Sequence, residues 1–574
     1  MKLMWSYLKK YKGLCFLNII LVFGFVLIEL GLPFVFSQMI DQAILKNQVH
    51  QVYYYGIMMV AVIVIGISMS MGLSYVSAKI MSGVITDMRR DLFNKVQHYS
   101  HETYEKIGNA SLLTRMTNDP VQVVNFLNML LRMGVTTPIM FFSSLLMIYQ
   151  ASHSLVLVIL ISLPLLLLGI WLIAHFSGPL SLKQQQALDQ MNGQMQEQLF
   201  GVRVIRAFNA QKEESEKFTA CNNHLAKQTT TLNLLMALSN PSFYLLFSLV
   251  LCAILWFGAK QLNTGTMEVG NYVAITEYVF HVLYSTMLFA SVFMMYPRAR
   301  VSSLRIKEVL SQKETLHGGE NMMTEPVKTL EFSDVSFTYP GDDKETLKHL
   351  SFTVNKGETV AFVGSIGSGK SSVLKLIARL YDPTAGTITI NGQDIKAYQL
   401  DSLRHHLGYV PQKAILFNGT IRSNLLDGKS DASEKELWQA LALAQAKSFV
   451  LEKENQLDET IVEGGSNFSG GQRQRLSIAR ALVRRPDVLL FDDSFSALDF
   501  KTDAKLRQAL QPILKETMTF IVAQRLSTVT DADKIIVLEK GEMVACGQHE
   551  ELLATSQLYR EIAESQLKEA DFDE

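Results

Sequence analysis

Long apolar runs fill the first half of the chain and stop near residue 300. Six of them are long enough to cross a bilayer as a helix, which takes about 20 residues. They lie at roughly 14–40, 54–76, 131–149, 155–176, 243–262 and 272–296. The two long polar segments between them, 78–129 and 177–241, are not rich in glycine and proline, so we expect the membrane helices to continue through them. The pattern predicts an all-helical transmembrane domain of six spans over residues 1–310.

Basic residues fall mainly on one side of this six-span arrangement. On the side shared with the N-terminus they are Lys9, Lys10, Arg89, Arg90, Lys183, Arg203, Arg206, Arg298 and Arg300. The opposite loops hold little more than Lys46 and Lys260. Because loops rich in Lys and Arg stay in the cytoplasm, both ends of the membrane domain are predicted to be cytoplasmic.

The second half follows a different pattern. Residues 311–328, which include Gly318 and Gly319, are typical of a linker. Short apolar runs then alternate with helical segments, which predicts an α/β domain over 329–566. Residues 330–339 alternate as an edge strand would, 359–363, 488–492 and 519–523 are typical of strands buried on both faces, and 534–547 predicts a terminal hairpin. The acidic tail 567–574 is predicted to be unstructured.

Charge and cysteine content give no support for a nucleic-acid partner or for a cysteine metal site. The chain has 53 basic and 54 acidic residues, and this balance gives no indication of a nucleic-acid partner. Its four cysteines, Cys15, Cys221, Cys252 and Cys546, lack the spacing of metal ligands. We therefore expect the cysteines to be packing residues.

The chemistry-bearing segment that is easiest to identify follows the strand at 359–363. It reads Gly364, Ser365, Ile366, Gly367, Ser368, Gly369, Lys370, Ser371 and Ser372 and leads into a helical run. This is a complete phosphate-binding P-loop. Its glycines let backbone N–H groups close on phosphates, Lys370 reaches the β- and γ-phosphate oxygens, and the Ser371 hydroxyl can ligate Mg²⁺.

A second segment, 467–499, combines a phosphate-binding turn with a metal-binding carboxylate. Ser469, Gly470 and Gly471 open a helix, whose N-terminus offers free N–H groups and a positive dipole end to a phosphate. The apolar strand that ends at Asp492 delivers a carboxylate to the C-terminal edge of a sheet.

These motifs together resemble those of ABC exporters in which membrane and ATPase domains are fused. The segment Asn467, Phe468, Ser469, Gly470, Gly471 and Gln472 resembles the ABC signature. Residues 488–492 resemble the Walker B strand, 496–499 the D-loop, and Tyr409 to Gln412 the Q-loop. The resemblance covers essentially the whole chain, and its nucleotide motifs are very specific.

The resemblance implies ATP and Mg²⁺ as cofactors and assigns further roles. It places Tyr339 against adenine, Gln412 near the attacking water, and Mg²⁺ against Ser371, Gln412 and Asp492. It also implies that short helices near 111–118 and 208–214 dock on ATPase domains. By this resemblance the protein is a multi-pass protein of the bacterial plasma membrane with a cytoplasmic ATPase domain.

Two positions depart from the family pattern. Asp493 stands where a catalytic glutamate usually follows the Walker B aspartate, and Gln524 stands at the position of the switch histidine. The shorter side chain draws the carboxylate back by more than ~1 Å, and misplacement of that size can cost ~10²-fold in rate. Glutamine keeps a hydrogen-bond donor but cannot carry a proton near neutral pH. Together the changes predict a site that binds ATP and cleaves it slowly.

The intact signature predicts a partner. In ABC ATPases each nucleotide is held between the Walker motifs of one domain and the signature of the other. A homodimer of this chain would hold two weak sites and two good signatures. We therefore expect a heterodimer with a second, homologous half-transporter, similar to the heterodimeric bacterial multidrug ABC exporters, with small hydrophobic or cationic drugs as substrates.

Other functions remain open. The chain also fits an exporter of a defined lipid or peptide, or a protein in which ATP binding gates a pore. No long regulatory insert separates the two halves, which weighs against the gated pore. The chain starts almost at its first span, so no leader-peptide protease domain is expected. Within the spans, Glu29, Glu277 and His281 either pair structurally or form a polar spot in a drug cavity.

Overall fold

The computed structural model describes residues 2–313 and 316–572 of the 574-residue chain. It divides into two compact units, one formed by 1–97 with 110–312 and the other by 98–109 with 313–574. The short segment 98–109 therefore belongs with the second unit, although the chain order places it inside the first half. Each unit is described by itself.

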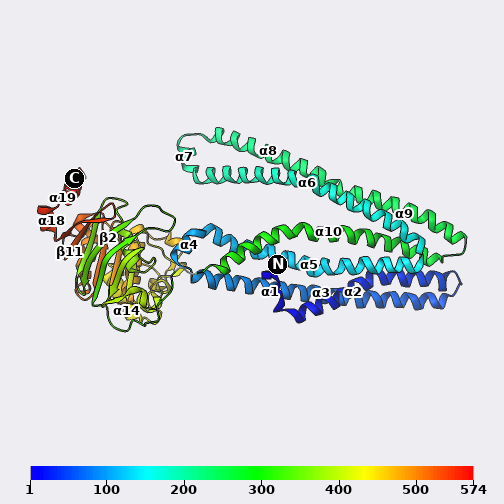
Figure 1. Cartoon of the computed structure of the whole chain (residues 1–574), viewed down its shortest axis with the longest axis horizontal. Helices are drawn as coiled ribbons and strands as arrows, with labels where there is room; N and C mark the ends of the chain where they lie inside the picture. The colour runs from blue at the N-terminus through cyan, green and yellow to red at the C-terminus, as the bar shows by residue number, and fades with distance from the viewer. Residues whose placement is uncertain (1, 314–315, 573–574) are drawn as a thin grey trace. The chain divides into compact units, whose positions relative to one another are not determined.

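The first unit consists of helices (Figure 1). They are α1 (Lys2–Lys9), α2 (Lys12–Gln38), a π-helical turn (Met39–Ile44), α3 (Val49–Gln97), α5 (Asn109–Ala151), α6 (His153–Phe200), α7 (Val202–Ala207), α8 (Gln211–Ala237), α9 (Ser239–Asn263) and α10 (Val269–Ser311). Six helical stretches are long and apolar enough to cross a membrane, and each contains one predicted span. The prediction of six spans is confirmed.

The membrane helices extend well beyond the apolar runs, as expected from the polar connections. α3 continues to Gln97 and α6 to Phe200. Buried polar pairs join neighbouring helices in this unit. The Asn18 amide donates to the Ser77 hydroxyl over 2.7 Å, and the Ser302 hydroxyl donates to Asp119 over 2.7 Å. Each bond satisfies one polar atom of a buried side chain, although Asn18 Oδ1 and Asp119 Oδ2 have no hydrogen-bond partner among the described residues.

Two short helices between the long ones lie earlier in the chain than predicted. α4 spans His101–Ile107 and α7 spans Val202–Ala207, whereas 111–118 lie inside the continuous helix α5. The prediction of short helices near 111–118 and 208–214 was therefore wrong in position. The reason is local: Ser100 caps α4 by accepting from the Thr103 amide, and Gly108, at φ 80°, ends it.

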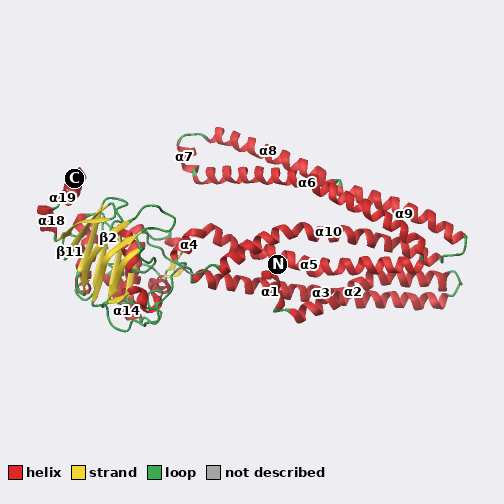
Figure 2. Cartoon of the chain, viewed as in Figure 1, coloured by secondary structure: helices red, strands yellow, loops and turns green. Residues whose placement is uncertain are grey.

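The second unit is built around a mainly parallel sheet of six strands (Figure 2). In spatial order the strands are β12 (Glu542–Gly547), β11 (Lys534–Glu539), β3 (Thr359–Gly364), β10 (Met518–Val522), β9 (Val488–Asp492) and β6 (Leu407–Val410). β12 pairs antiparallel with β11, so the predicted terminal hairpin is confirmed. The helices that matter for the site are α11 (Lys370–Ile377), α16 (Gly470–Val483) and α17 (Phe500–Leu514).

A second sheet of four strands carries the start of this unit. Its order is β2 (Leu347–Asn355), β1 (Thr329–Phe337), β4 (Ala385–Ile390) and β5 (Gln393–Asp394). β1 pairs with β2 on one side and with β4 on the other. The prediction of an edge strand at 330–339 was therefore wrong. Alternation shows that one face is buried, and an inner antiparallel strand produces the same alternation.

The other strands and α-helices of this unit are β7 (Gly419–Thr420), β8 (Thr460–Ile461), α12 (Leu400–His405), α13 (Ile421–Leu426), α14 (Glu434–Leu443), α15 (Lys447–Leu451), α18 (His549–Thr555) and α19 (Gln557–Phe572). Residues 567–572 belong to helix α19, so the prediction of an unstructured tail was wrong for them. Glu, Lys, Leu and Ala, which occur in this stretch, are good helix formers. Residues 573–574 lie outside the described residues.

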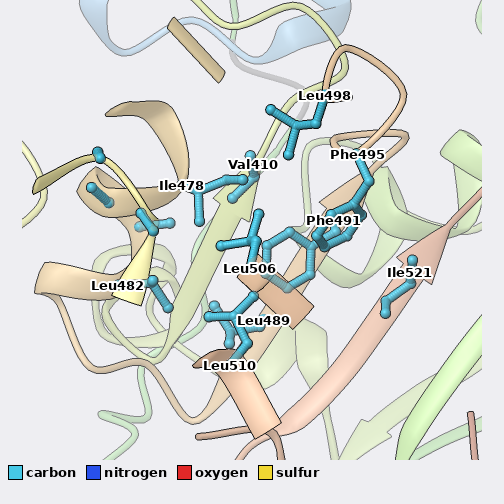
Figure 3. Close-up of a cluster of buried hydrophobic side chains, with 14 of the residues drawn as sticks. Val410, Ile478, Leu482, Leu489, Phe491, Phe495, Leu498, Leu506, Leu510 and Ile521 are labelled. Carbon is cyan, nitrogen blue, oxygen red and sulfur yellow. The ribbon is translucent and has the colours of Figure 1, made fainter. Parts of the chain in front are cut away.

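Strand β9 is buried on both faces, as its continuous apolar run predicted. Leu489 and Phe491 pack into one core together with Ile478 and Leu506 of the helices α16 and α17 (Figure 3). The alternate residues of the strand pack into the other core, against the four-stranded sheet and α11. Because both faces of β9 are fixed, the carboxylates that follow Phe491 are held at the C-terminal edge of the sheet.

Candidate nucleotide site

The P-loop joins strand β3 to helix α11. Gly369 has a φ of 99°, and a Cβ there would lie 2.5 Å from Leu347 Cδ2, so this position requires glycine. The Lys370 ammonium donates to the carbonyls of Gly364, over 2.8 Å, and Ser365, over 2.7 Å. Burial lowers the pKa of Lys370, and the charges of the nearby carboxylates oppose this. The lysine is thus held within the loop by the groups that shape it.

Asp492 lies at the end of β9, next to the first turn of α11. The Ser371 hydroxyl donates to Asp492 Oδ1 over 2.6 Å, and the Tyr409 hydroxyl donates to Oδ2 over 3.2 Å. Burial and the Asp492 carboxylate raise the pKa of Tyr409, so the phenol stays protonated and donates. Sequence reasoning missed Tyr409, although β6 lies beside β9 in the sheet and Tyr409 belongs to the predicted Q-loop motif.

The Ser371 and Asp492 oxygens form a suitable start for a divalent cation site. They are hard ligands, which Mg²⁺ prefers, and Mg²⁺ usually binds one or two carboxylates together with substrate phosphates. Among residues 2–313 and 316–572, no group of three or more His, Cys, Asp and Glu side chains forms an all-protein metal site. The arrangement therefore fits a cation that arrives with a phosphate chain.

The two residues that depart from the family pattern, Asp493 and Gln524, are hydrogen-bonded to each other. The Gln412 amide donates to Asp493 Oδ2 over 3.1 Å, and the Gln524 amide donates to the same oxygen over 2.8 Å. The backbone of Asp493 has a φ of 49°, in the left-handed region that Asp and Asn tolerate better than most residues. Burial raises the pKa of Asp493, while the hydrogen bond from Gln412 opposes this. The structure thus brings together three of the predicted site residues.

Tyr339 follows strand β1 and belongs to a group of aromatic side chains. Its hydroxyl shares a hydrogen bond of 2.9 Å with the hydroxyl of Ser372, the last residue of the P-loop segment. Its ring lies edge-on to those of Phe337, at 4.8 Å between centroids, and Tyr381, at 5.3 Å. Sequence reasoning did not identify Tyr381, which packs between Tyr339 and helix α4.

The signature segment forms the capped N-terminus of α16. Ser469 Oγ accepts from the Gln472 amide over 3.2 Å, and the Gln472 side chain accepts from the Ser469 amide over 3.0 Å. This reciprocal capping box fixes the turn. Phe468 is buried in the core, and the Asn467 amide donates to the Thr460 carbonyl over 2.8 Å. Ser469 and Gly470 are exposed. The turn is therefore rigid and open to a ligand from outside the chain.

Two cavities among the described residues of the membrane unit are of similar size. One, of about 690 Å³, is lined almost entirely by apolar side chains of α6, α8, α9 and α10. The other, of about 670 Å³, is lined by polar, aromatic and methionine side chains together with Glu29, Arg132 and His281. In it His281 Nε2 lies 3.6 Å from Glu29 Oε2. Glu29 and His281 therefore both pair with each other and line a cavity, so the two readings are not exclusive.

Comparison with known proteins gives the same division of the chain. Residues 15–287 match the family model described as the ABC transporter transmembrane region, and residues 347–496 match the family model described as ABC transporter. The second match includes the P-loop, the Q-loop, the signature and the Walker B strand.

Relatives align over nearly the whole chain. An uncharacterized ABC transporter ATP-binding protein of Bacillus subtilis, YfiB, is 36% identical over 98% of both chains. A multidrug resistance ABC transporter ATP-binding and permease protein of Lactococcus lactis is 33% identical, over 84% of this chain and 82% of its own. The structure of a bacterial Atm1-family ABC exporter with ATP bound superimposes with a TM-score of 0.81, at 24% identity, over 97% of this chain and 98% of its own.

Proposed function

Since the chain belongs to the ABC transporter family, we propose that it is one subunit of a heterodimeric exporter that moves hydrophobic and amphipathic drugs out of the cytoplasm or the inner leaflet. Membership of this family supports the membrane location and the ATPase domain. The six membrane helices and the ATPase domain make it a multi-pass bacterial membrane protein with a nucleotide-binding domain in the cytoplasm. The heterodimer, the division of labour between sites and the drug class are the proposal.

In this proposal the Walker residues of this chain hold MgATP. The P-loop amides and Lys370 bind the phosphates, and Tyr339 contacts the adenine. Ser371, Asp492 and Gln412 would hold Mg²⁺, which neutralises phosphate charge when bound. The hydrogen bond between Ser371 and Asp492 supports this assignment because it places two hard oxygen ligands side by side.

The observation that carries the proposal is the geometry at Asp493. A general base must reach within hydrogen-bonding distance of the water that it activates. One oxygen of this short carboxylate already accepts from both Gln412 and Gln524. Gln524 cannot take up a proton near neutral pH, so the site lacks a titratable partner for the γ-phosphate at this position. These features support slow hydrolysis in the site that this chain builds.

The signature of this chain has the opposite character. Its turn is capped, anchored by Phe468 and exposed at Ser469 and Gly470. A helix N-terminus with free amides is suited to bind the phosphates of a nucleotide held by another chain. We infer that it completes the competent ATP site, whose catalytic glutamate and histidine belong to the partner.

The substrate class rests on the cavities and on one relative. Both cavities have the volume of drug-sized ligand sites. Methionine and aromatic linings adapt to varied ligands, and a carboxylate such as Glu29 can accept a cation. The Lactococcus lactis relative is named for multidrug resistance, which is in line with this class.

Dye uptake into inverted membrane vesicles tests the proposal. Vesicles would contain this chain alone, the partner alone, or both, and a fluorescent cationic dye would be followed with and without ATP. We expect ATP-dependent accumulation only when both chains are present. The control is the complex in which the partner's catalytic glutamate is changed to glutamine, which should accumulate little dye.

Other outcomes would select other functions. Accumulation by this chain alone would refute the heterodimer. Movement of a fluorescent lipid, with no dye uptake, would favour a lipid exporter. Dye that equilibrates but never accumulates above the outside concentration would indicate an ATP-gated pore.

A further inference from the structure

One face of helix α5 carries a polar stripe inside the membrane unit. Asn125, Asn128 and Arg132 line the cavity of about 670 Å³ that also contains Glu29 and His281, here named the polar cavity. Positions 125, 128 and 132 are three and four residues apart, so their side chains lie on the same side of the helix. The other residues that α5 contributes to this wall are methionines and threonines. This face of α5 is therefore suited to a polar ligand rather than to lipid tails.

Arg132 is the charged member of this stripe. Its side chain is exposed, and the Thr136 hydroxyl donates to its backbone carbonyl without engaging the guanidinium. Among residues 2–313 and 316–572, no carboxylate forms an ion pair with this guanidinium. An arginine near the start of a span can extend toward lipid headgroups, whereas Arg132 forms part of the cavity wall. Its N–H donors are therefore available to a ligand inside the cavity.

A group of opposite charge lines the same cavity from another helix. Glu29 belongs to α2, and its Oε2 atom lies 3.6 Å from Nε2 of His281 on α10. The Glu29 side chain remains 33% exposed, so the contact with His281 does not close it off from a ligand. The polar cavity thus offers one group that accepts a cation and, on a different helix, one that binds an anion.

Aromatic rings add a flat apolar surface to the polar cavity. Phe280 and Tyr284 both line it, and their rings stack at 11° with 5.4 Å between centroids. Aromatic faces pack against planar rings and attract delocalised cations. The cavity also has the volume of a drug-sized ligand site. The lining therefore suits a planar amphiphile that carries both a positive and a negative group.

We propose that Arg132 and Asn128 form a subsite for the carboxylate of a transported amphiphile, so that the preferred substrates are zwitterions rather than simple cations. The proposal rests on the proposed function in one respect, that the polar cavity receives the cargo. A guanidinium binds both oxygens of a carboxylate through parallel N–H bonds. Helical side chains lean toward the N-terminus, so Arg132 extends over Asn128, whose amide can donate to the same carboxylate.

This subsite gives the cavity a basis for discrimination. A simple cation satisfies Glu29 but brings a second positive charge into a cavity that already holds Arg132. A zwitterion pairs with both groups, and charges attract more strongly in a partly dehydrated cavity than in water. The acid group of a substrate, rather than its ring system, should therefore decide how strongly Arg132 contributes to binding.

Equilibrium dye binding to the purified complex of both subunits tests the proposal. One probe is tetramethylrhodamine, whose free carboxylate makes it a zwitterion at neutral pH. The other is its methyl ester, which has the same cationic ring and lacks the acid. The complex would be held without ATP in phosphatidylcholine nanodiscs, and binding to empty nanodiscs would be subtracted. Bound dye would be released into acidic ethanol before its fluorescence is read, so that the cavity itself does not alter the signal.

Arg132→Gln keeps a side-chain amide and removes the charge. We expect it to weaken binding of the acid about tenfold and to leave the affinity for the ester within about twofold. Arg132→Lys keeps the charge but loses the paired donors, so it should weaken binding of the acid less than glutamine does. Glu29→Gln should weaken both dyes to a similar extent, because they share the cationic ring. The matched control is Arg300→Gln, the same change at an exposed position of α10 outside the polar cavity, which should bind both dyes normally.

Three results would overturn the proposal. One is an equal loss of affinity for both dyes in Arg132→Gln, as expected if Arg132 only supports the helix packing. Another is unchanged binding of the acid in that variant. The third comes from nanodiscs that also contain phosphatidylglycerol: if the effect of Arg132→Gln on the acid disappears there, a lipid headgroup rather than the cargo occupies the subsite.

The outcome is separable from that of the transport assay. ATP-driven dye uptake by the complex, together with no role of Arg132 in binding the acid, would refute the subsite and leave the exporter assignment standing. If neither dye binds to the complex, the assignment of drugs as cargo fails, and the subsite fails with it.

Discussion

The signature turn and the Walker B edge of this chain lie on consecutive elements of one domain, yet they differ in chemical quality. The signature keeps every residue of its pattern, and its capping box and buried Phe468 hold it in a rigid, exposed turn. At the Walker B edge the carboxylate is short, buried and bonded to two amides. In the proposed function the first region stabilises charge on a phosphate, and the second lacks a well-placed base.

This difference supports the proposal that the domain contributes to two half-sites rather than forming one weakened enzyme. If the whole domain had lost its function, the signature would be free to change, since nothing in its own fold requires a glycine at 470. A Cβ at that position would meet no atom within 4 Å. In the proposed heterodimer, a nucleotide held by the partner approaches this turn closely, and that approach accounts for a glycine at this position.

The largest expected effect comes from blocking the signature. Gly470→Asp places a negative charge where the partner's γ-phosphate is expected to bind, and Ser469→Arg fills the same space. We expect either change to lower maximal ATPase activity of the complex by ~10²-fold or more, as when a charge-stabilising donor is removed from an active site. Transport should fall equally. The measurement is the maximal ATPase rate of the purified complex.

Gly470→Ala is the matched control, because the open space around this position means that the fold tolerates a methyl group. It should leave the complex folded and more active than Gly470→Asp. The corresponding aspartate in the partner's signature should reduce activity less, because that turn closes the slow site. If the partner's variant is inactive while Gly470→Asp retains most activity, the two sites have been assigned to the wrong chains.

The second effect is that of the missing partner. Purified alone, this chain carries Asp493 and Gln524 in every site that it can form. We expect its ATPase activity to be about 10²-fold below that of the complex, which is the scale of a catalytic group misplaced by ~1 Å. Robust hydrolysis by the lone chain, abolished by Lys370→Ala, would contradict the division into two half-sites.

The sequence predicted the six spans, the nucleotide motifs and the buried strands because each has a pattern that is local in the chain. Val488 to Phe491 form a continuous apolar run, and that alone implies burial on both faces. The position of β1 was mistaken because alternation reports the burial of one face and says nothing about neighbours within the sheet. The prediction of an unstructured tail was wrong because it relied on the acidic composition and gave less weight to the helix-forming residues in the same stretch.

The parts of the site that were missed depend on pairs distant in sequence. Tyr381 meets Glu105 across a separation of 276 residues, and Tyr409 meets Asp492 across 83. No local pattern encodes either contact. Helix α4 was placed too late because the prediction put a short helix after Gly108, whereas Ser100 caps the N-terminus of α4 and Gly108 ends the helix.

A smaller effect is expected from removing the short carboxylate. Asp493→Gln in the complex should reduce ATPase activity by no more than about threefold, because slow chemistry has little rate to lose. The equivalent change at the partner's glutamate should cost ~10²-fold. Both rates would be measured at saturating ATP in the same lipid. Equal losses from the two substitutions would show that both sites hydrolyse ATP at similar rates.

The smallest expected effect is on the pH dependence of ATP hydrolysis in the slow site. This dependence can be measured in the Gly470→Asp complex, because that substitution is expected to inactivate the competent site. Burial raises the pKa of Asp493 above that of an ordinary carboxyl group, so Asp493 takes up a proton at a higher pH than an exposed aspartate does. A protonated carboxyl cannot accept a proton from water. The residual ATPase rate of the Gly470→Asp complex should therefore fall as the pH is lowered from neutrality. The fall should begin at a higher pH than it would if the base were an exposed carboxylate. Adding Asp493→Asn should remove this fall together with most of the residual rate. A residual rate with the same pH profile in both complexes would mean that Asp493 is not the base of the slow site, and that its place between Gln412 and Gln524 serves only to hold the loops together.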